Sequence, residues 1–87
     1  MENLKIDLGC IAHNNKAKQE VVWMLNNLGF TTGFKSIDFY CYLYACVGKQ
    51  APYDMTIQFG NSAKTFNNNK GREISIGELR SLVRGKE

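Results

Sequence analysis

Apolar and polar residues alternate most clearly over residues 37–47. A β-strand sends successive side chains to opposite faces of its sheet. One face of this strand would carry only apolar side chains, those of Phe39, Cys41, Leu43, Ala45 and Val47. The other face would carry Tyr40, Tyr42 and Tyr44. We therefore expect one face to lie against a core and the three phenols to form a row on the other.

The same alternation predicts three further strands. Residues 4–10 and residues 55–59 each alternate apolar side chains with polar residues or glycine. The sequence Gly60-Asn61-Ser62 is typical of a hairpin turn. A short strand over residues 63–66 is expected to complete that hairpin.

Two segments show the three-and-four spacing of an amphipathic helix. The first covers residues 16–28, and Asn14 or Asn15 before it is a suitable N-cap. Gly29 after it can take the left-handed conformation that often ends a helix. The second helix is expected over residues 76–84.

A capping box marks the start of the second helix. Ser75 and Glu78 have the Ser-x-x-Glu spacing in which each side chain binds the backbone amide of the other residue. Ile74 and Leu79 have the spacing of a hydrophobic staple. Gly85 is expected to end this helix.

These elements give the order β-α-β-β-β-α in a single domain over residues 1–87. The expected fold class is α+β, a two-layer sandwich in which the helices cover one face of a mostly antiparallel sheet. The other face of the sheet would be open unless another segment covers it.

Composition and charge narrow the class of protein. The hydrophobic fraction is 44% and the charged fraction is 22%, as in an ordinary globular domain. The net charge of +3 is too mild for a committed nucleic-acid binder. The sequence carries neither a long apolar run nor the pattern of a signal peptide. Three cysteines cannot all pair, which favours reduced thiols and a cytoplasmic location.

The aromatic residues are the candidates for binding a partner. Tyr40, Tyr42 and Tyr44 are strand formers on a half-wet face in one interpretation and an interaction surface in the other. Trp23 lies about 150° from the centre of the apolar face of its helix, since each residue turns a helix by about 100°. It either lies flat across the helix surface or anchors a partner.

The start of the first helix is a candidate anion site. Free amide groups at a helix N-terminus and nearby cations can hold a phosphate. The residues concerned are Asn14, Asn15, Lys16 and Lys18, with Arg72 as a further cation. A plain solvated turn is the simpler interpretation, and the sequence contains no glycine-rich phosphate loop.

The sequence contains little that indicates a metal site or a catalytic site. Cys10 and His13 are one candidate ligand pair, but Cys41 and Cys46 would diverge on a strand, whereas a structural zinc site needs four converging ligands. A pair formed by Cys10 and His13 would also lack a third group to orient the imidazole. We therefore expect no metal, no cofactor and no catalytic site.

In its layout the chain resembles the small accessory proteins of bacteriophages. The shared features are a first strand, a helix ending in Leu28-Gly29-Phe30, an aromatic strand, a short hairpin and the terminal sequence at residues 73–79. The resemblance implies host takeover or counter-defence by non-covalent binding in the host cytoplasm. The target would be a host protein or a signalling nucleotide, and no active-site residue is implied.

Three functions follow as hypotheses. The first is a non-catalytic module that inhibits or modulates a host protein through the tyrosine face and Trp23. The second is a sponge for an anionic nucleotide, held at the helix start or at an interface between copies of the chain. The third is single-stranded nucleic-acid binding, in which bases stack on the tyrosines. A homodimer is compatible with each hypothesis, and no membrane contact is expected.

Overall fold

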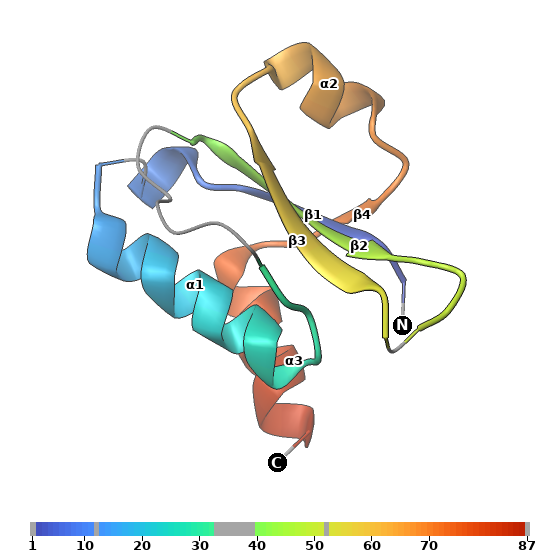
Figure 1. Cartoon of the computed structure of the whole chain (residues 1–87). Coiled ribbons are helices and arrows are strands. Elements are labelled where there is room, and N and C mark those ends of the chain that lie inside the picture. The colour runs from blue at the N-terminus through green and yellow to red at the C-terminus, as the bar shows by residue number, and fades with distance from the viewer. Residues whose placement is uncertain (1, 12, 33–39, 52, 87) are drawn as a thin grey trace.

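The structure, a computed structural model, describes residues 2–11, 13–32, 40–51 and 53–86. It is a compact α+β domain with a four-stranded sheet and three α-helices in the described residues (Figure 1). The elements are β1 (Leu4–Asp7), the 3-10 helix η1 (Gly9–Ile11), α1 (Asn15–Asn27), β2 (Tyr42–Val47), β3 (Met55–Gly60), α2 (Ala63–Asn68), β4 (Arg72–Glu73) and α3 (Ile76–Lys86). The predicted fold class is confirmed.

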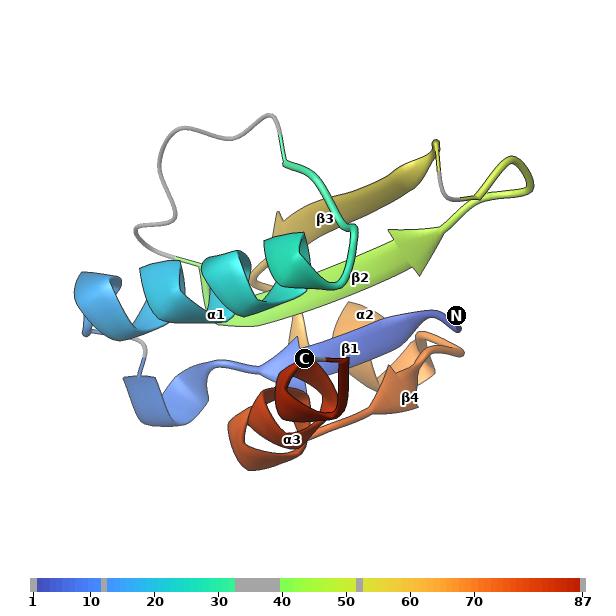
Figure 2. The ribbon, with the colours of Figure 1, turned by 90° about the horizontal axis from the view of Figure 1, so that it is seen from below.

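The sheet is mixed, with the strand order β3-β2-β1-β4. β2 runs antiparallel to both of its neighbours, with Leu43 opposite Ile6 of β1 and Ala45 opposite Ile57 of β3. β4 runs parallel to β1 and places Glu73 beside Lys5. The two central strands therefore come from the N-terminus and the middle of the chain, and the last strand joins the edge of β1 (Figure 2).

The core lies between one face of this sheet and the helices α1 and α3. Alternation along β1 and β2 sends Ile6, Leu43 and Ala45 to that face, where they are fully buried. The buried apolar cluster comprises Leu4, Ile6, Leu8, Val21, Val22, Leu25, Leu28, Phe30, Leu43, Ala45, Met55, Ile57, Ile74 and Leu79.

The ends of α1 follow the sequence prediction closely. The Asn14 side chain accepts a hydrogen bond from the Ala17 amide at 3.0 Å, so Asn14 is the N-cap. Gly29 has a φ of 103°, which is the left-handed conformation expected after the helix. Phe30 then folds back into the core, and its amide binds the Leu25 carbonyl at 3.0 Å.

The capping box of α3 is also confirmed. The Glu78 amide donates to Ser75 Oγ at 3.1 Å, and the Ser75 amide donates to Glu78 Oε1 at 3.3 Å. Ile74 and Leu79 are both buried in the core, as a hydrophobic staple requires. The predicted end of the helix at Gly85 is wrong, because α3 continues to Lys86.

The predicted strand over residues 63–66 is wrong, because these residues begin α2. Ser62 caps this helix by accepting a hydrogen bond from the Thr65 amide at 3.2 Å. A cap of this kind satisfies a free amide at the helix start and so competes with the hairpin turn that the sequence indicated. The fourth strand is instead the two-residue β4.

The limits of two predicted strands also change. β1 ends at Asp7, and the chain turns at once into η1, where the predicted strand had continued to Cys10. β2 begins at Tyr42, so Tyr40 and Cys41 of the predicted strand are not part of it, and residues 37–39 lie outside the described residues.

The helices do not all cover one face of the sheet. α1 and α3 pack on the core face, while α2 lies on the opposite side of the sheet (Figure 1). That opposite face carries Tyr42, Tyr44 and Lys5, the side chains that alternate with the core residues of β2 and β1. The two predicted helices, α1 and α3, therefore share one face as expected, and α2, which the sequence did not predict as a helix, lies on the other.

Candidate functional site

The tyrosine face of β2 is covered rather than open. The ring of Phe66 from α2 stacks on Tyr42, with ring centroids 4.7 Å apart and an interplanar angle of 27°. The same ring meets Tyr44 at 6.1 Å in a tilted arrangement. Tyr44 is only 7% exposed and Tyr42 is half-buried. Phe66 therefore covers Tyr44 and part of Tyr42 while α2 stays in place.

Tyr40 does not share this face. It lies before the start of β2, and its ring contacts Phe59 with centroids 5.5 Å apart. Phe59 is opposite Leu43 in the sheet and packs against the core on the α1 side. The predicted row of three phenols is therefore reduced to Tyr42 and Tyr44.

The Tyr44 hydroxyl is buried without a hydrogen-bond partner in the part of the chain that the structure describes. Burial raises the pKa of this phenol, because the charged phenolate would lose its hydration, and the neighbouring Tyr42 raises it further. Tyr44 is therefore neutral at physiological pH and serves to pack the face. Burying its hydroxyl without a hydrogen bond is unfavourable.

Lys5 lies beneath α2 on the same face. Its Nζ atom donates to the Phe66 carbonyl at 2.7 Å and to the Asn69 carbonyl at 3.0 Å, and it lies 4.8 Å from the centroid of the Phe66 ring. The carbonyls at the C-terminal end of a helix carry partial negative charge, which attracts a cation. The buried ammonium of Lys5 thus binds the C-terminal end of α2 to the sheet.

Trp23 is the large aromatic side chain that the fold leaves open on a helix. It is 60% exposed, while Val21, Val22 and Leu25 of the same helix are buried. It therefore lies on the side of α1 that points away from the core, as its position in the sequence predicts. We call this side the outer face of α1, and its exposed residues are Lys16, Gln19, Glu20, Trp23, Asn26 and Asn27.

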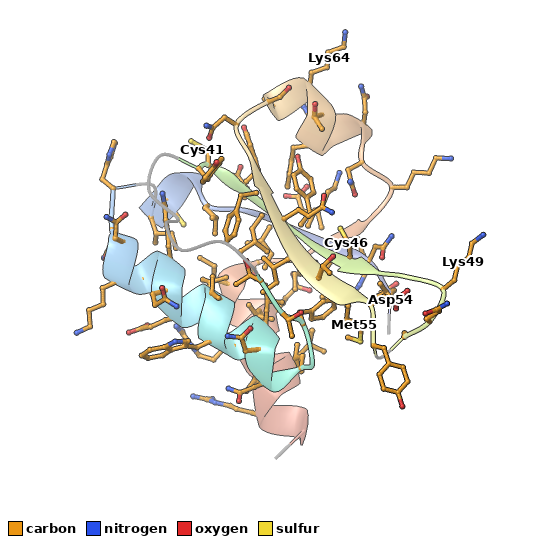
Figure 3. The ribbon with its side chains drawn as sticks, viewed as in Figure 1. Cys41, Cys46, Lys49, Asp54, Met55 and Lys64 are labelled. Carbon is orange, nitrogen blue, oxygen red and sulfur yellow. The ribbon has the colours of Figure 1, made fainter. Side chains whose placement is uncertain are left out.

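A second exposed aromatic residue lies at the turn between β2 and β3. Tyr53 is 93% exposed and follows the loop that holds Lys49. The side chain of Asp54 accepts the Gln50 amide at 2.8 Å and so fixes this turn (Figure 3). Tyr53 lies in the turn of a hairpin, whereas Trp23 lies among the polar side chains of its helix face.

The residues of the predicted anion site do not converge. The Asn14 side chain is used as the cap of α1, while Asn15 and Lys16 are exposed beside it. Lys18 is 1% exposed, so its ammonium cannot meet a ligand in solution.

Arg72 belongs to another part of the molecule. It forms an ion pair with Glu2 and lies in β4, at the end of the sheet away from the start of α1 (Figures 1 and 2). The described residues therefore do not place the predicted cations around one ligand.

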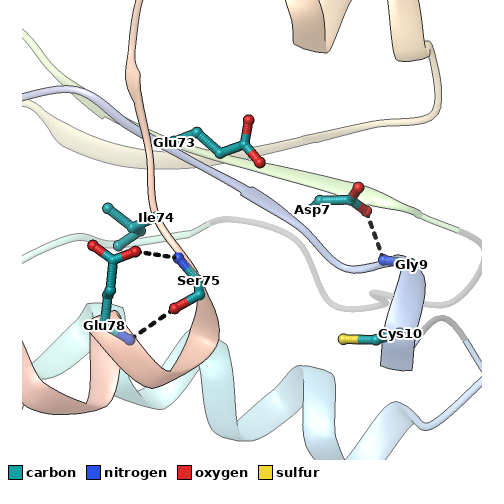
Figure 4. A pocket seen from close by; sticks show the side chains of 7 residues that line it. All are labelled: Asp7, Gly9, Cys10, Glu73, Ile74, Ser75 and Glu78. Carbon is teal, nitrogen blue, oxygen red and sulfur yellow. Dashed lines mark hydrogen bonds between the residues drawn. The ribbon is translucent and has the colours of Figure 1, made fainter.

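The structure adds an open pocket that the sequence did not indicate (Figure 4). It forms where the end of β1 and the start of η1 meet the segment leading from β4 into α3. Its lining residues are Asp7, Gly9, Cys10, Glu73, Ile74, Ser75 and Glu78. They come from two stretches that are more than sixty residues apart, and the short parallel pairing of β4 with β1 brings them side by side.

Three carboxylates make this pocket acidic, but two of them already bind backbone amides. Asp7 Oδ1 accepts from the Gly9 amide at 2.8 Å, and Glu78 accepts from the Ser75 amide as part of the capping box. Among the described residues, no group of three or more His, Cys, Asp or Glu is arranged to hold a metal ion. The two bound carboxylates have clear structural roles at the starts of η1 and α3.

Fold and surface together define a small α+β domain with a buried polar-aromatic cluster under α2 and an exposed tryptophan on α1. No protein-family model matches the chain, and neither the curated proteins nor the solved structures give a match. Within the described residues, none of the helices has the length and apolar character needed to cross a membrane.

Proposed function

We propose that this chain is a non-catalytic protein-binding module whose contact surface is the outer face of α1, with Trp23 at its centre. The exposed indole of Trp23 is the observation that carries the proposal. Burying a large aromatic side chain is strongly favourable, so a helix that turns one toward water forgoes that stabilisation. Tryptophan is also among the residues that most often dominate binding energy at protein interfaces.

The neighbours of Trp23 suit the rim of such a surface. Lys16 and Glu20 supply one charge of each sign, and Gln19 and Asn26 supply amide groups that can donate and accept hydrogen bonds. An apolar centre within a polar rim is the usual composition of a protein interface. The rim would orient a partner, while burial of the indole would supply most of the affinity.

The tyrosine face is left out of this contact surface. Phe66 covers Tyr42 and Tyr44, and Tyr40 contacts Phe59 on the other side of the sheet. Nucleotide or single-stranded nucleic-acid binding stays a prediction from the sequence. The dispersed positions of Lys16, Lys18 and Arg72 give it no geometric support.

A host protein is the partner that we propose, on the strength of the resemblance to bacteriophage accessory proteins. The module would block or modulate that protein by occupying its surface, with no reaction involved. The free thiols of Cys10, Cys41 and Cys46 are compatible with a reducing cytoplasm, where such a partner would be met.

Capture from a bacterial host lysate by the tagged chain tests this proposal. We expect Trp23→Ala to weaken binding of the captured protein by roughly thirtyfold, since a tryptophan hot spot contributes about 2 kcal/mol or more. Tyr53→Ala is the matched control, because it removes an exposed aromatic side chain at a different place in the fold and should leave capture unchanged. Circular dichroism should show both variants folded, as neither side chain belongs to the core.

Two outcomes would contradict the proposal. One is undiminished capture of the same protein by the folded Trp23→Ala variant. The other is a homodimer of the wild-type chain, detected by light scattering, that Trp23→Ala converts to a monomer. In that case a second copy of the chain occupies the outer face of α1.

A further inference from the structure

α2 is attached to the sheet at very few points. Phe66 is its one buried residue, and its other residues are exposed. The segments on either side of α2 are polar. Asn61 and Ser62 precede it, and the sequence Asn69-Lys70-Gly71 follows it. The Asn61 side chain accepts the Cys41 amide at 2.9 Å, so the attachment loosens only after Asn61. A segment with little buried apolar area and exposed connections belongs to the least stable part of a fold.

Lys5 makes the polar part of this attachment. Its two hydrogen bonds go to the carbonyls of Phe66 and Asn69, at the last turn of α2. Hydrogen bonds from a charged donor are stronger than neutral ones, and the ammonium also lies over the Phe66 ring. One side chain of β1 therefore holds both the backbone and the aromatic anchor of α2.

Lys5 also has a second set of possible partners nearby. Glu73 lies directly beside it in the parallel pairing of β4 with β1, and Asp7 follows two residues later on the same face of β1. Both carboxylates extend over the open pocket (Figure 4). Within the described residues Glu73 forms no ion pair. The ammonium can thus leave the carbonyls of α2 and still meet negative charge.

The Tyr44 hydroxyl supplies a reason for opening. In the closed arrangement it is buried and has no partner among the described residues. A buried hydroxyl without a hydrogen bond costs free energy that exposure to water would return. Displacing Phe66 would therefore hydrate Tyr44, and this hydration would offset part of the free energy needed to separate the Phe66 ring from the two tyrosines.

From these contacts we propose that residues 62–69 are a hinged cover over the Tyr42 and Tyr44 face, which Lys5 holds closed and whose opening transfers the Lys5 ammonium to Glu73 and Asp7. The open state exposes a second aromatic surface on the side of the sheet away from α1. It requires no unfolding of the core, because the core residues lie on the other face. This opening is independent of the function proposed for Trp23.

Native-state hydrogen exchange measures the opening directly. In the wild-type chain we expect the Phe66 and Asn69 amides, which bind the carbonyls of Ser62 and Phe66, to exchange faster than the amides of β2. Lys5→Met keeps the length of the side chain but removes its ammonium. This variant should speed exchange of the α2 amides by about tenfold, the effect of losing hydrogen bonds from a charged donor.

Two further variants separate the parts of the proposal. Lys64→Met is the matched control, because Lys64 lies on α2 itself but points away from the sheet, and it should leave exchange unchanged (Figure 3). Glu73→Gln removes a partner of the released ammonium and should slow exchange of the α2 amides by about threefold, the effect of a modest ion pair. Nitration of the Tyr44 ring reports its exposure. The rate of this nitration, followed by mass spectrometry, should be low in the wild type and higher in Lys5→Met.

The proposal is overturned if the α2 amides exchange at the same rate as those of β2 in the wild type, or if Lys5→Met speeds both sets equally. Either result would mean that α2 opens only when the whole domain unfolds. Faster α2 exchange without faster nitration of Tyr44 would reduce the motion to fraying of a short helix. Unchanged exchange in Glu73→Gln would overturn the second site for the ammonium.

Discussion

At the scale of single residues, Tyr44 is the side chain whose chemistry fits its surroundings least well. Its ring is well packed between Phe66 and the sheet, but its hydroxyl is buried and has no partner in the described residues. Gly60 on the neighbouring strand lies so close that an added Cβ atom would contact the Tyr44 ring at 3.4 Å. The ring therefore fills its site, and the unfavourable part of Tyr44 is its unpaired hydroxyl oxygen.

Tyr44→Phe should stabilise the protein. It removes the buried hydroxyl and keeps the ring, so the free energy of unfolding should rise by about 1 kcal/mol. Urea denaturation measures this change. Tyr53→Phe is the control, because an exposed hydroxyl is hydrated in both states and its removal should have no effect. A lower stability of Tyr44→Phe would show that the hydroxyl has a partner after all.

The stabilising effect of Tyr44→Phe should depend on pH. The pKa of Tyr44 is raised in the folded state above its ordinary value of 10.0. Below about pH 10 the phenol is neutral in both the folded and the unfolded state, so the wild type keeps its full stability. As the pH rises through the folded-state pKa, the unfolded state ionises more readily and the stability of the wild type falls. The advantage of Tyr44→Phe over the wild type should therefore grow in alkaline urea titrations.

At the scale of secondary-structure elements, the helices with strong local signals were predictable. The periodic apolar residues of α1 and the capping box of α3 act over a few neighbouring positions, so the sequence contains the whole signal. α2 has a single apolar anchor in six residues, which gives no periodicity to detect. Its identity as a helix depends on the Ser62 cap and on the place that Phe66 finds between Tyr42, Tyr44 and Lys5.

The capping box of α3 supplies a prediction at this scale. Ser75→Ala removes the acceptor of the Glu78 amide and should lower the free energy of unfolding by about 1 kcal/mol. Ser81→Ala, an exposed position within the same helix, should leave stability unchanged or slightly higher, because alanine is the better helix former. Thermal or urea denaturation of the two variants makes the comparison. If both variants unfold with the same free energy, the capping box does not stabilise α3.

At the scale of the whole molecule, the sequence predicted the composition of the layers better than their arrangement. The alternation along residues 39–47 correctly separates Leu43 and Ala45 from Tyr42 and Tyr44. It could not indicate that a segment twenty residues later would cover the tyrosines, because that contact depends on the tertiary path of the chain. The pocket at Asp7 and Glu73 depends in the same way on the pairing of β4 with β1.

The position of Trp23 could be predicted, since it follows from helix geometry alone. Lys18 shows the limit of that reasoning, because a lysine expected near a ligand is buried within the domain. The two sides of the molecule therefore differ in character. The outer face of α1 is exposed in the structure, whereas Tyr44 becomes exposed only if α2 moves.

Fluorescence of Trp23 during titration with the captured protein tests the central claim most directly, because Trp23 is the one tryptophan of the chain. Spectra are recorded with a partner produced with a non-fluorescent tryptophan analogue, so that emission comes from Trp23 alone. We predict that the emission moves to shorter wavelength and that quenching by iodide disappears as the complex forms, because the indole leaves water. Binding that leaves both the emission and the quenching of Trp23 unchanged would contradict a contact surface on the outer face of α1.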